Sequence, residues 1–339
     1  MAFNLRNLLG LRDRRERSIE DIMVDRDDYV MPRDPTDFFN HHGYQALVRN
    51  QLKLSDVVYH RSFQFGHYFV GKKYDAPLVP RWACEADGVE RKNYNMKVFE
   101  HNENNSIWEN YEYKAKAEIY IRQKLKHENI SKYYGTIALS DNHIHRGCYI
   151  LKLEFTQCNL QSVIDVMHYT VPQSRRLLRQ IGGAIQYLHE KKIAHLAITT
   201  MTIRIKELDR SNYEEELNHN VIYKLSDFAY ARKYKVPYGV AEERELPEFL
   251  DDTNYNAPET VGLSYNPFKA DMFSLGGVIL TSLVGQQTAF RLMNQYSMLA
   301  AKDLFRQEVF DFRTMTFTFS SLNNNVDERL DSRHLATFY

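Results

Sequence analysis

Few residues in this chain have the types and spacing that chemistry requires, and the first candidate is a stretch rich in glycine and lysine. Residues 66–73, GHYFVGKK, imitate the opening of the G-x-x-x-x-G-K-[ST] motif, whose backbone amides and lysine hold phosphates. Neither serine nor threonine follows the lysine, and the stretch lies in a region of strand-like composition. We therefore reject it as a phosphate-binding motif of that kind.

The cysteines do not indicate a metal site or a disulfide framework. Cys84, Cys148 and Cys158 lack paired metal-ligand spacing, and three cysteines are too few to crosslink a chain of 339 residues. A reducing compartment is therefore expected. The opening MAFNLRNLLGLRDRRERS has no long apolar core of a signal peptide, and no segment approaches the ~18 apolar residues of a membrane span. We expect a soluble cytoplasmic protein, with the nucleus as an alternative.

The charges balance, since 44 lysines and arginines face 44 aspartates and glutamates. No net field would draw the whole molecule onto nucleic acid or an anionic membrane. We therefore expect no nucleic-acid partner, and partners that recognise local surfaces.

Apolar patterns divide the chain into three parts. Residues 1–55 are charge-dense and broken by prolines, which predicts a partly disordered extension that is either a solvated tail or a docking arm. Strand-like segments follow from Val57 to about Leu153, with one helix pattern at residues 111–125. Helical patterns dominate from Leu160 onward. The sequence predicts an α+β protein in which a small β-rich lobe precedes a larger helical lobe.

Several short motifs fall in one order along these two lobes and carry a family resemblance. They are YNMKVF, AEIYIRQKLKHENI, IQYLHEKKIAHLAITTMTI, YKLSDFAYAR, YNAPE and KADMFSLGGVIL. From about Val57 to Tyr339 the chain resembles a eukaryotic protein kinase. The resemblance implies a kinase-like domain over residues 56–339, with an N-lobe of about 56–153 that contains the αC helix and a C-lobe of about 154–339.

The resemblance implies that part of a nucleotide site is retained. Lys97 stands at the place of the β3 lysine, which meets the α- and β-phosphates, and Glu118 at the place of its αC partner. Gly66 and Gly71 match the first and third glycines of the glycine-rich loop, but Tyr68 replaces the second and would hinder a close approach to phosphates. These glycines are either part of a nucleotide lid or ordinary turn glycines.

The catalytic loop has lost its reactive groups. HLAITTMTI, from His195 onward, aligns with H-R-D-L-K-P-E-N-I, so that Ala197 replaces the catalytic aspartate and Leu196 the arginine that pairs with a phosphorylated loop. Thr199 replaces the lysine and Thr202 the metal-binding asparagine. The resemblance also implies that His195 is a packed structural residue.

The remaining motifs imply one degraded metal site and an intact large lobe. Asp227 of DFA could still hold a cation weakly, whereas an alanine replaces the motif's glycine, so we expect weak ATP binding and doubt a Mg²⁺ site. Residues 257–259 match A-P-E, and Asp271 takes the place of the αF aspartate that braces the catalytic loop. Arg329 is either the distant partner of Glu259 or a solvated helix arginine.

Two polar insertions are expected on the surface, at Leu208–Asn220 and at Pro77–Arg91. Each is either a partner site or a neutral loop expansion.

The sequence thus predicts a pseudokinase that acts as a scaffold or allosteric regulator in intracellular signalling. Its expected partners are proteins, such as an active kinase or the substrate of one. An alternative is an unusual active serine/threonine kinase that recruits Asp209 or Asp251 as its base, and another is a sensor that binds ATP without turnover. We also expect that phosphorylation at Thr253 or Tyr255 cannot order the activation loop through Leu196.

Overall fold

The computed structural model divides into two compact units. Unit 1 comprises Met1–Lys124 and Lys132–Phe155, and unit 2 comprises Leu125–Ser131 and Thr156–Tyr339. The structure describes residues 52–53, 57–61, 67–71, 82–86, 90–99, 108–140, 147–156, 158–165, 167–206, 221–241, 246, 254–295 and 311–339. Within these residues, no helix is long and apolar enough to cross a membrane.

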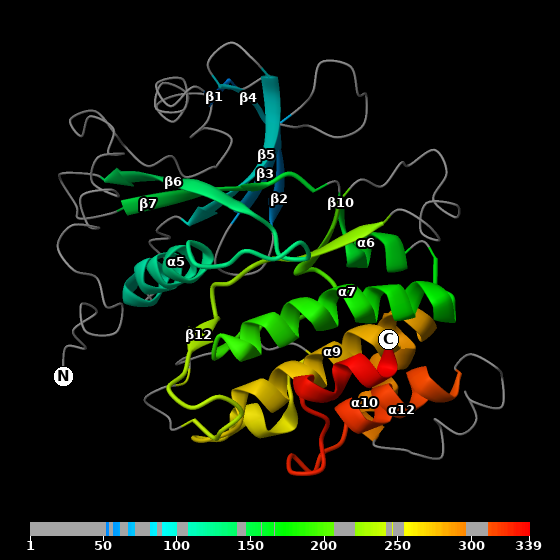
Figure 1. The fold of residues 1–339 in the computed structure, drawn as a ribbon. Helices are drawn as coiled ribbons and strands as arrows, with labels where there is room; N and C mark the ends of the chain where they lie inside the picture. The colour runs from blue at the N-terminus through cyan, green and yellow to red at the C-terminus, as the bar shows by residue number, and fades with distance from the viewer. Residues whose placement is uncertain are drawn as a thin grey trace. The chain divides into compact units, whose positions relative to one another are not determined.

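Unit 1 is built on a seven-stranded antiparallel sheet (Figure 1). Its strands are β1 (Leu52–Lys53), β2 (Val57–Arg61), β3 (His67–Gly71), β4 (Trp82–Ala86), β5 (Glu90–Phe99), β6 (Tyr133–Ser140) and β7 (Gly147–Glu154). The strand order is β1-β4-β5-β3-β2, and β7 pairs with both β5 and β6. Residues 90–94 of β5 pair with β4 and residues 95–98 pair with β3, whereas residues 94–99 pair with β7. The ten residues of β5 therefore tie the whole sheet together.

The second half of β5 carries Lys97. In register, Lys97 faces Tyr68 of β3 on one side and Leu151 of β7 on the other. Helix α5 (Trp108–Arg122), the helix of this unit that the structure describes, packs against β5 and β7 and buries Ile119. Because the sheet holds the lysine and the helix covers its surface, side chains of α5 can meet Lys97 away from water.

The expected loop expansion at Pro77–Arg91 is wrong for part of its length. Residues Trp82–Ala86 form β4, which pairs with β1 on one side and with the first half of β5 on the other. The extra residues therefore widen the sheet. The sequence prediction treated this stretch as polar, although four of the five residues of β4 (Trp82, Ala83, Cys84 and Ala86) are apolar.

Unit 2 is mainly helical and also holds short strands. Its elements are β8 (Cys158–Asn159), α6 (Leu160–Ile164), α7 (Val171–Glu190), β9 (Ile193–Ala194), β10 (Ile203–Lys206), β11 (Ile222–Leu225), β12 (Arg232–Lys233), η2 (Pro258–Val261), α9 (Pro267–Val284), α10 (Gln286–Gln295), α12 (Phe312–Ser321) and η3 (Ser332–Phe338). Strands β8, β10 and β11 form one small sheet, and β9 pairs with β12. These strands frame the loop that aligned with the kinase catalytic loop.

Helix α9 is the centre of unit 2, with α7, α10 and α12 packed around it (Figure 1). It starts cleanly because the Asn266 side chain accepts hydrogen bonds from the amides of Phe268 and Lys269, with a proline at the first helical position. Gly276 lets α12 approach closely, since a Cβ there would lie 2.8 Å from the Cβ of Ser321. A small sheet unit and a larger helical unit confirm the predicted fold class.

Candidate functional site

The retained lysine and glutamate form a buried ion pair. Lys97 Nζ lies 2.8 Å from Glu118 Oε2, and the two side chains are 1% and 0% exposed. Strand β5 supplies the lysine and α5 the glutamate, as the sequence predicted. Such burial excludes the alternative of a solvated lysine and a surface glutamate.

A second cation holds the other oxygen of the same carboxylate. Arg122 Nε donates a 2.6 Å hydrogen bond to Glu118 Oε1, and this guanidinium is also buried. Sequence reasoning missed Arg122. Its position four residues after Glu118 on the same helix was the available signal, because residues at i and i+4 lie on one helix face. The arginine in the last turn also sits favourably at the negative end of the helix dipole.

Part of the predicted glycine-rich loop forms a strand. Residues His67–Gly71 are strand β3, in which Tyr68 pairs with His60 and Gly71 pairs with Val57. Tyr68 and Gly71 therefore lie in a strand that pairs with β2, and the assignment of Gly66 and Gly71 to a nucleotide lid stays a prediction. Gly66 lies outside the described residues, as do all of residues 62–66.

In unit 2, Asp271 braces the degenerate catalytic loop as predicted. Its carboxylate accepts the backbone amides of His195 and Leu196, each at 2.7 Å, and also contacts His189 Nε2 at 3.0 Å. Leu196 adopts φ +59°, a left-handed conformation that costs a leucine roughly 1–3 kcal/mol. The two hydrogen bonds from the backbone amides of His195 and Leu196 to Asp271 stabilise this conformation.

His195 is a structural residue, which confirms its predicted role. The imidazole is fully buried, its Nε2 lies 3.0 Å from the carbonyl oxygen of Ser226, and its ring meets Phe228 edge-on at 4.7 Å. The ring therefore joins the loop to the DFA segment.

The rest of the loop is closed on itself by two threonines. Thr202 Oγ1 donates to the carbonyl oxygen of Ala197 at 2.7 Å and accepts the amide of Thr199 at 2.9 Å. Thr199 Oγ1 in turn accepts the amides of Met201 and Thr202, both at 3.2 Å. The Thr202 hydroxyl, which stands at the metal-binding position, thus stabilises the turn. Its proton and one of its lone pairs are already used in hydrogen bonds within the loop.

A further polar network, not foreseen from the sequence, ties this loop to α9. Thr200 Oγ1 lies 3.1 Å from the hydroxyl of Tyr255, which donates to Thr281 Oγ1 at 3.3 Å. Burial raises the pKa of the Tyr255 phenol. Tyr255 is buried, so its hydroxyl can be phosphorylated only if this network opens. The prediction that a phosphate there cannot order the loop through Leu196 stays a prediction.

The DFA aspartate is buried, so it is not an ordinary exposed loop residue. Asp227 adopts φ +63°, which aspartate tolerates better than most residues, and its Oδ1 accepts the Ala229 amide in a long 3.4 Å contact. Ala229 itself is not among the residues with positive φ. Alanine in place of glycine therefore causes no backbone strain in this conformation.

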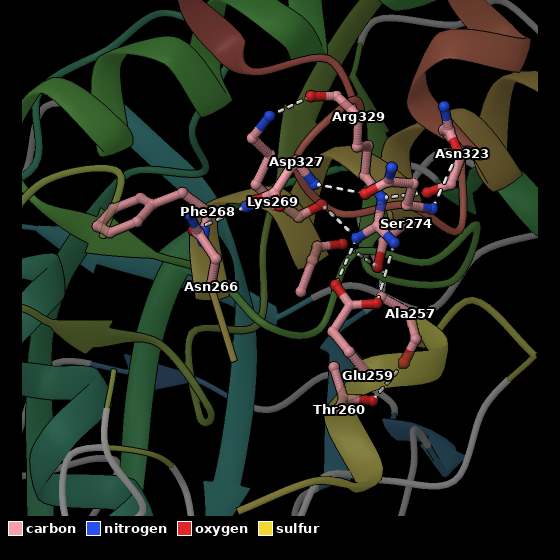
Figure 2. Close-up of polar contacts among 12 residues, drawn as sticks. Ala257, Glu259, Thr260, Asn266, Phe268, Lys269, Ser274, Asn323, Asp327 and Arg329 are labelled. Atoms are coloured by element: carbon pink, nitrogen blue, oxygen red, sulfur yellow. Dashed lines mark hydrogen bonds and ion pairs between the residues drawn. The ribbon is translucent and has the colours of Figure 1, made fainter. Parts of the chain in front are cut away.

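Arg329 is the partner of Glu259, which settles the alternative left open by the sequence. Figure 2 shows the guanidinium facing the carboxylate, with Nη2 donating to Oε2 at 2.9 Å and Nη1 to Oε1. The arginine also donates to the carbonyl oxygens of Asn323 (2.8 Å) and Lys269 (3.2 Å). This fork locks the A-P-E segment against the start of α9 and the loop before η3.

Some predicted residues cannot be placed. Asp209, Asp251, Thr253 and the Leu208–Asn220 insertion lie outside the described residues. Among the residues that the structure does describe, no group of three or more histidine, cysteine or acidic side chains could hold a metal ion.

Comparison with known proteins agrees with this arrangement. The chain is 28% identical over 177 residues to the inactive serine/threonine-protein kinase PLK5 of Mus musculus, and 29% identical over 174 residues to the serine/threonine-protein kinase ULK1 of Homo sapiens. These matches cover 51% and 50% of this chain, but only 25% and 15% of the relatives. The family model described as protein kinase domain matches residues 86–332. Together with the two-unit fold and the Lys97–Glu118 pair, this match shows that the chain belongs to the protein kinase domain family.

Proposed function

We propose that this protein is a pseudokinase that acts by binding, as a scaffold or allosteric regulator of another signalling protein. The observation that carries the proposal is the closed loop around Ala197. At the position where a kinase needs a carboxylate to orient the substrate hydroxyl, a methyl group stands, and the neighbouring carbonyl is taken by Thr202. The similarity to the mouse protein PLK5, which is described as an inactive serine/threonine-protein kinase, supports this proposal.

The donor groups near the loop fit Mg²⁺ poorly. A hard dication prefers several oxygen ligands in near-octahedral geometry. Asp227 offers a carboxylate, but the Thr202 hydroxyl that replaces the asparagine amide is engaged in the turn. We therefore derive no step through a metal ion.

Nucleotide binding would instead depend on Lys97. Its ammonium shares the Glu118 carboxylate with Arg122, so that two cationic side chains lie close together in this cluster. Such a cluster favours an approaching phosphate. Weak, Mg²⁺-independent binding of ATP is thus the form of nucleotide recognition that this chain supports best. The positive charge that attracts the phosphates would come from Lys97 in unit 1.

The activity test is radiolabelled phosphate transfer from ATP, with and without Mg²⁺, to the chain itself and to generic protein substrates. We expect no incorporation above background. The matched control is Asp227→Ala, which removes the last potential metal ligand of the loop. Incorporation by the wild type that disappears in Asp227→Ala would refute the proposal and support an unusual active kinase.

The binding test is a thermal-shift titration with ATP, since a ligand that binds only the folded protein raises its apparent stability. We expect a small shift that is unchanged by Mg²⁺, is lost in Lys97→Met and is retained in Lys132→Met, a substitution of an exposed lysine. A shift that requires Mg²⁺ and persists in Lys97→Met contradicts this account of the site. No shift at any ATP concentration would favour a scaffold over a nucleotide sensor.

A further inference from the structure

Two aliphatic side chains are exposed to solvent on the segment that follows β12. Val236 is 65% and Val240 is 70% exposed, whereas Tyr234 between them and β12 is buried. The segment is nevertheless anchored, because the Tyr238 ring packs on Phe268 at 5.5 Å. The two valines therefore project from a fixed backbone, and their exposure does not result from a loose loop.

Lysines lie directly beside these valines. Lys233 and Lys235 are exposed on and after β12, and Lys192 is exposed at the end of α7. The two segments are joined, since the Tyr234 amide donates to the carbonyl oxygen of Lys192 at 2.8 Å and Lys192 Nζ donates to the carbonyl oxygen of Lys235 at 3.1 Å. We call Lys192, Lys233, Lys235, Val236 and Val240 the lysine–valine surface.

More exposed aliphatic groups follow across a backbone bridge. The Ala241 amide donates to the carbonyl oxygen of Tyr265 at 2.9 Å, which brings the end of the lysine–valine surface to the chain after η2. Val261, the last residue of η2, is 94% exposed, and Leu263 just after η2 is 70% exposed. A run of apolar groups rimmed by charge is typical of a protein interaction site, whereas scattered single residues are not.

We propose that the lysine–valine surface binds an acidic segment of another protein, in which carboxylates alternate with aliphatic side chains. The charge of the described residues argues for this occupant. Among them, Glu190 is the exposed carboxylate nearest in sequence to Lys192, and it already accepts a hydrogen bond from Gln186, so that lysines outnumber acids on the described part of this surface. Strand β12 belongs to a two-stranded sheet, and an extended segment can pair with such a sheet edge. In an extended segment successive side chains point to opposite sides. A segment in which acidic and aliphatic residues alternate would therefore present its carboxylates on one side and its aliphatic groups on the other.

This inference does not rest on the loss of phosphoryl transfer. The residues of the lysine–valine surface lie just after α7, in β12 and in the segment that follows β12, and none of them belongs to the degenerate loop. An active kinase and a pseudokinase could both use it, so failure of one proposal leaves the other standing.

The test uses the full chain and a fluorescein-labelled peptide of about ten residues, in which glutamate and aspartate alternate with valine and leucine. Fluorescence anisotropy should show saturable binding that weakens with salt. The double variants Lys192→Glu/Lys235→Glu and Val236→Asp/Val240→Asp should each weaken it by about tenfold or more. The control Lys124→Glu/Lys126→Glu, which changes two exposed lysines of the segment after α5, should stay within about twofold.

Matched peptides and vesicles separate the other occupants. A peptide with lysine for each acid, or serine for each aliphatic residue, should bind at least about tenfold more weakly, and phosphatidylserine vesicles should not compete. Equal binding of all three peptides, binding that ignores the valine substitutions, or retention on vesicles alone would each overturn the proposal. The acidic run that follows Ala241 has similar chemistry, so the peptide should bind Glu242→Gln/Glu243→Gln/Glu245→Gln at least as tightly as the wild type. Weaker binding there would also overturn it.

Discussion

The shared carboxylate of Glu118 predicts that the Lys97 ion pair is dispensable for folding as long as Arg122 remains. In a buried pair, removing one partner usually costs about 3–5 kcal/mol because the other charge is left uncompensated. Here each oxygen of Glu118 has its own cation, at 2.8 and 2.6 Å. After Lys97→Met the carboxylate keeps one charged partner, so the loss should approach the lower end of the range for one hydrogen bond to a charged group, about 1.5–2 kcal/mol.

The double substitution is expected to behave differently. Lys97→Met with Arg122→Leu leaves a fully buried carboxylate without a cation, which should cost about 5 kcal/mol or more in total. The two substitutions should therefore be non-additive by roughly 1–3 kcal/mol, within the range for residues that share a partner. Adding Glu118→Gln to the double variant removes the buried charge and should recover much of the loss.

The assay is urea unfolding followed by tryptophan fluorescence. Both tryptophans, Trp82 and Trp108, lie in unit 1, so their signal reports the unit that contains the ion pair. Lys132→Met is the control for removing a lysine from the surface of the same unit. The denaturant slopes should agree among variants, so that midpoints report stability. Additive costs within about 0.5 kcal/mol, or a single Lys97→Met cost above about 3 kcal/mol, would refute the shared-carboxylate reasoning.

Three further outcomes are expected. Arg329→Met should destabilise unit 2 by about 3 kcal/mol, seen as faster hydrogen exchange in α9, and Glu259→Gln in the same chain should recover part of this because no unpaired carboxylate remains. Burial lowers the pKa of His127, whose Nδ1 accepts a hydrogen bond from a backbone amide at 3.0 Å. The folding stability should therefore be full above the unfolded pKa of ~6.5 and fall as the pH drops below it, and His127→Gln should lose this dependence. The same fall in stability at acid pH in His127→Gln would contradict the assignment to His127. Gly276→Ala should destabilise by about 1–3 kcal/mol in calorimetry, whereas Gly183→Ala, with nothing within 4 Å, should be neutral or stabilising; the reverse order would contradict the packing described for α9.

The sequence by itself determined the family, the two-part architecture and the positions of the lost catalytic groups. These features are local: apolar periodicity predicts each helix and strand, and a motif such as HLAITTMTI is read from residues that are adjacent in the chain. The Lys97–Glu118 and Glu259–Arg329 pairs were also predictable, since the family resemblance supplied the long-range pairing that periodicity lacks.

Only the tertiary structure decided how the altered residues are used. The sequence gives Arg122 and Thr202 as side chains with several potential partners, and burial against Glu118 or against the loop carbonyl selects one of them. Two further features also depend on long-range contacts: Trp82–Ala86 is a strand because it pairs with other strands, and the Tyr255 hydroxyl is buried because it reaches Thr281 of α9. A polar side chain removed from water must find a hydrogen bond, and which group supplies it depends on segments far apart in the sequence.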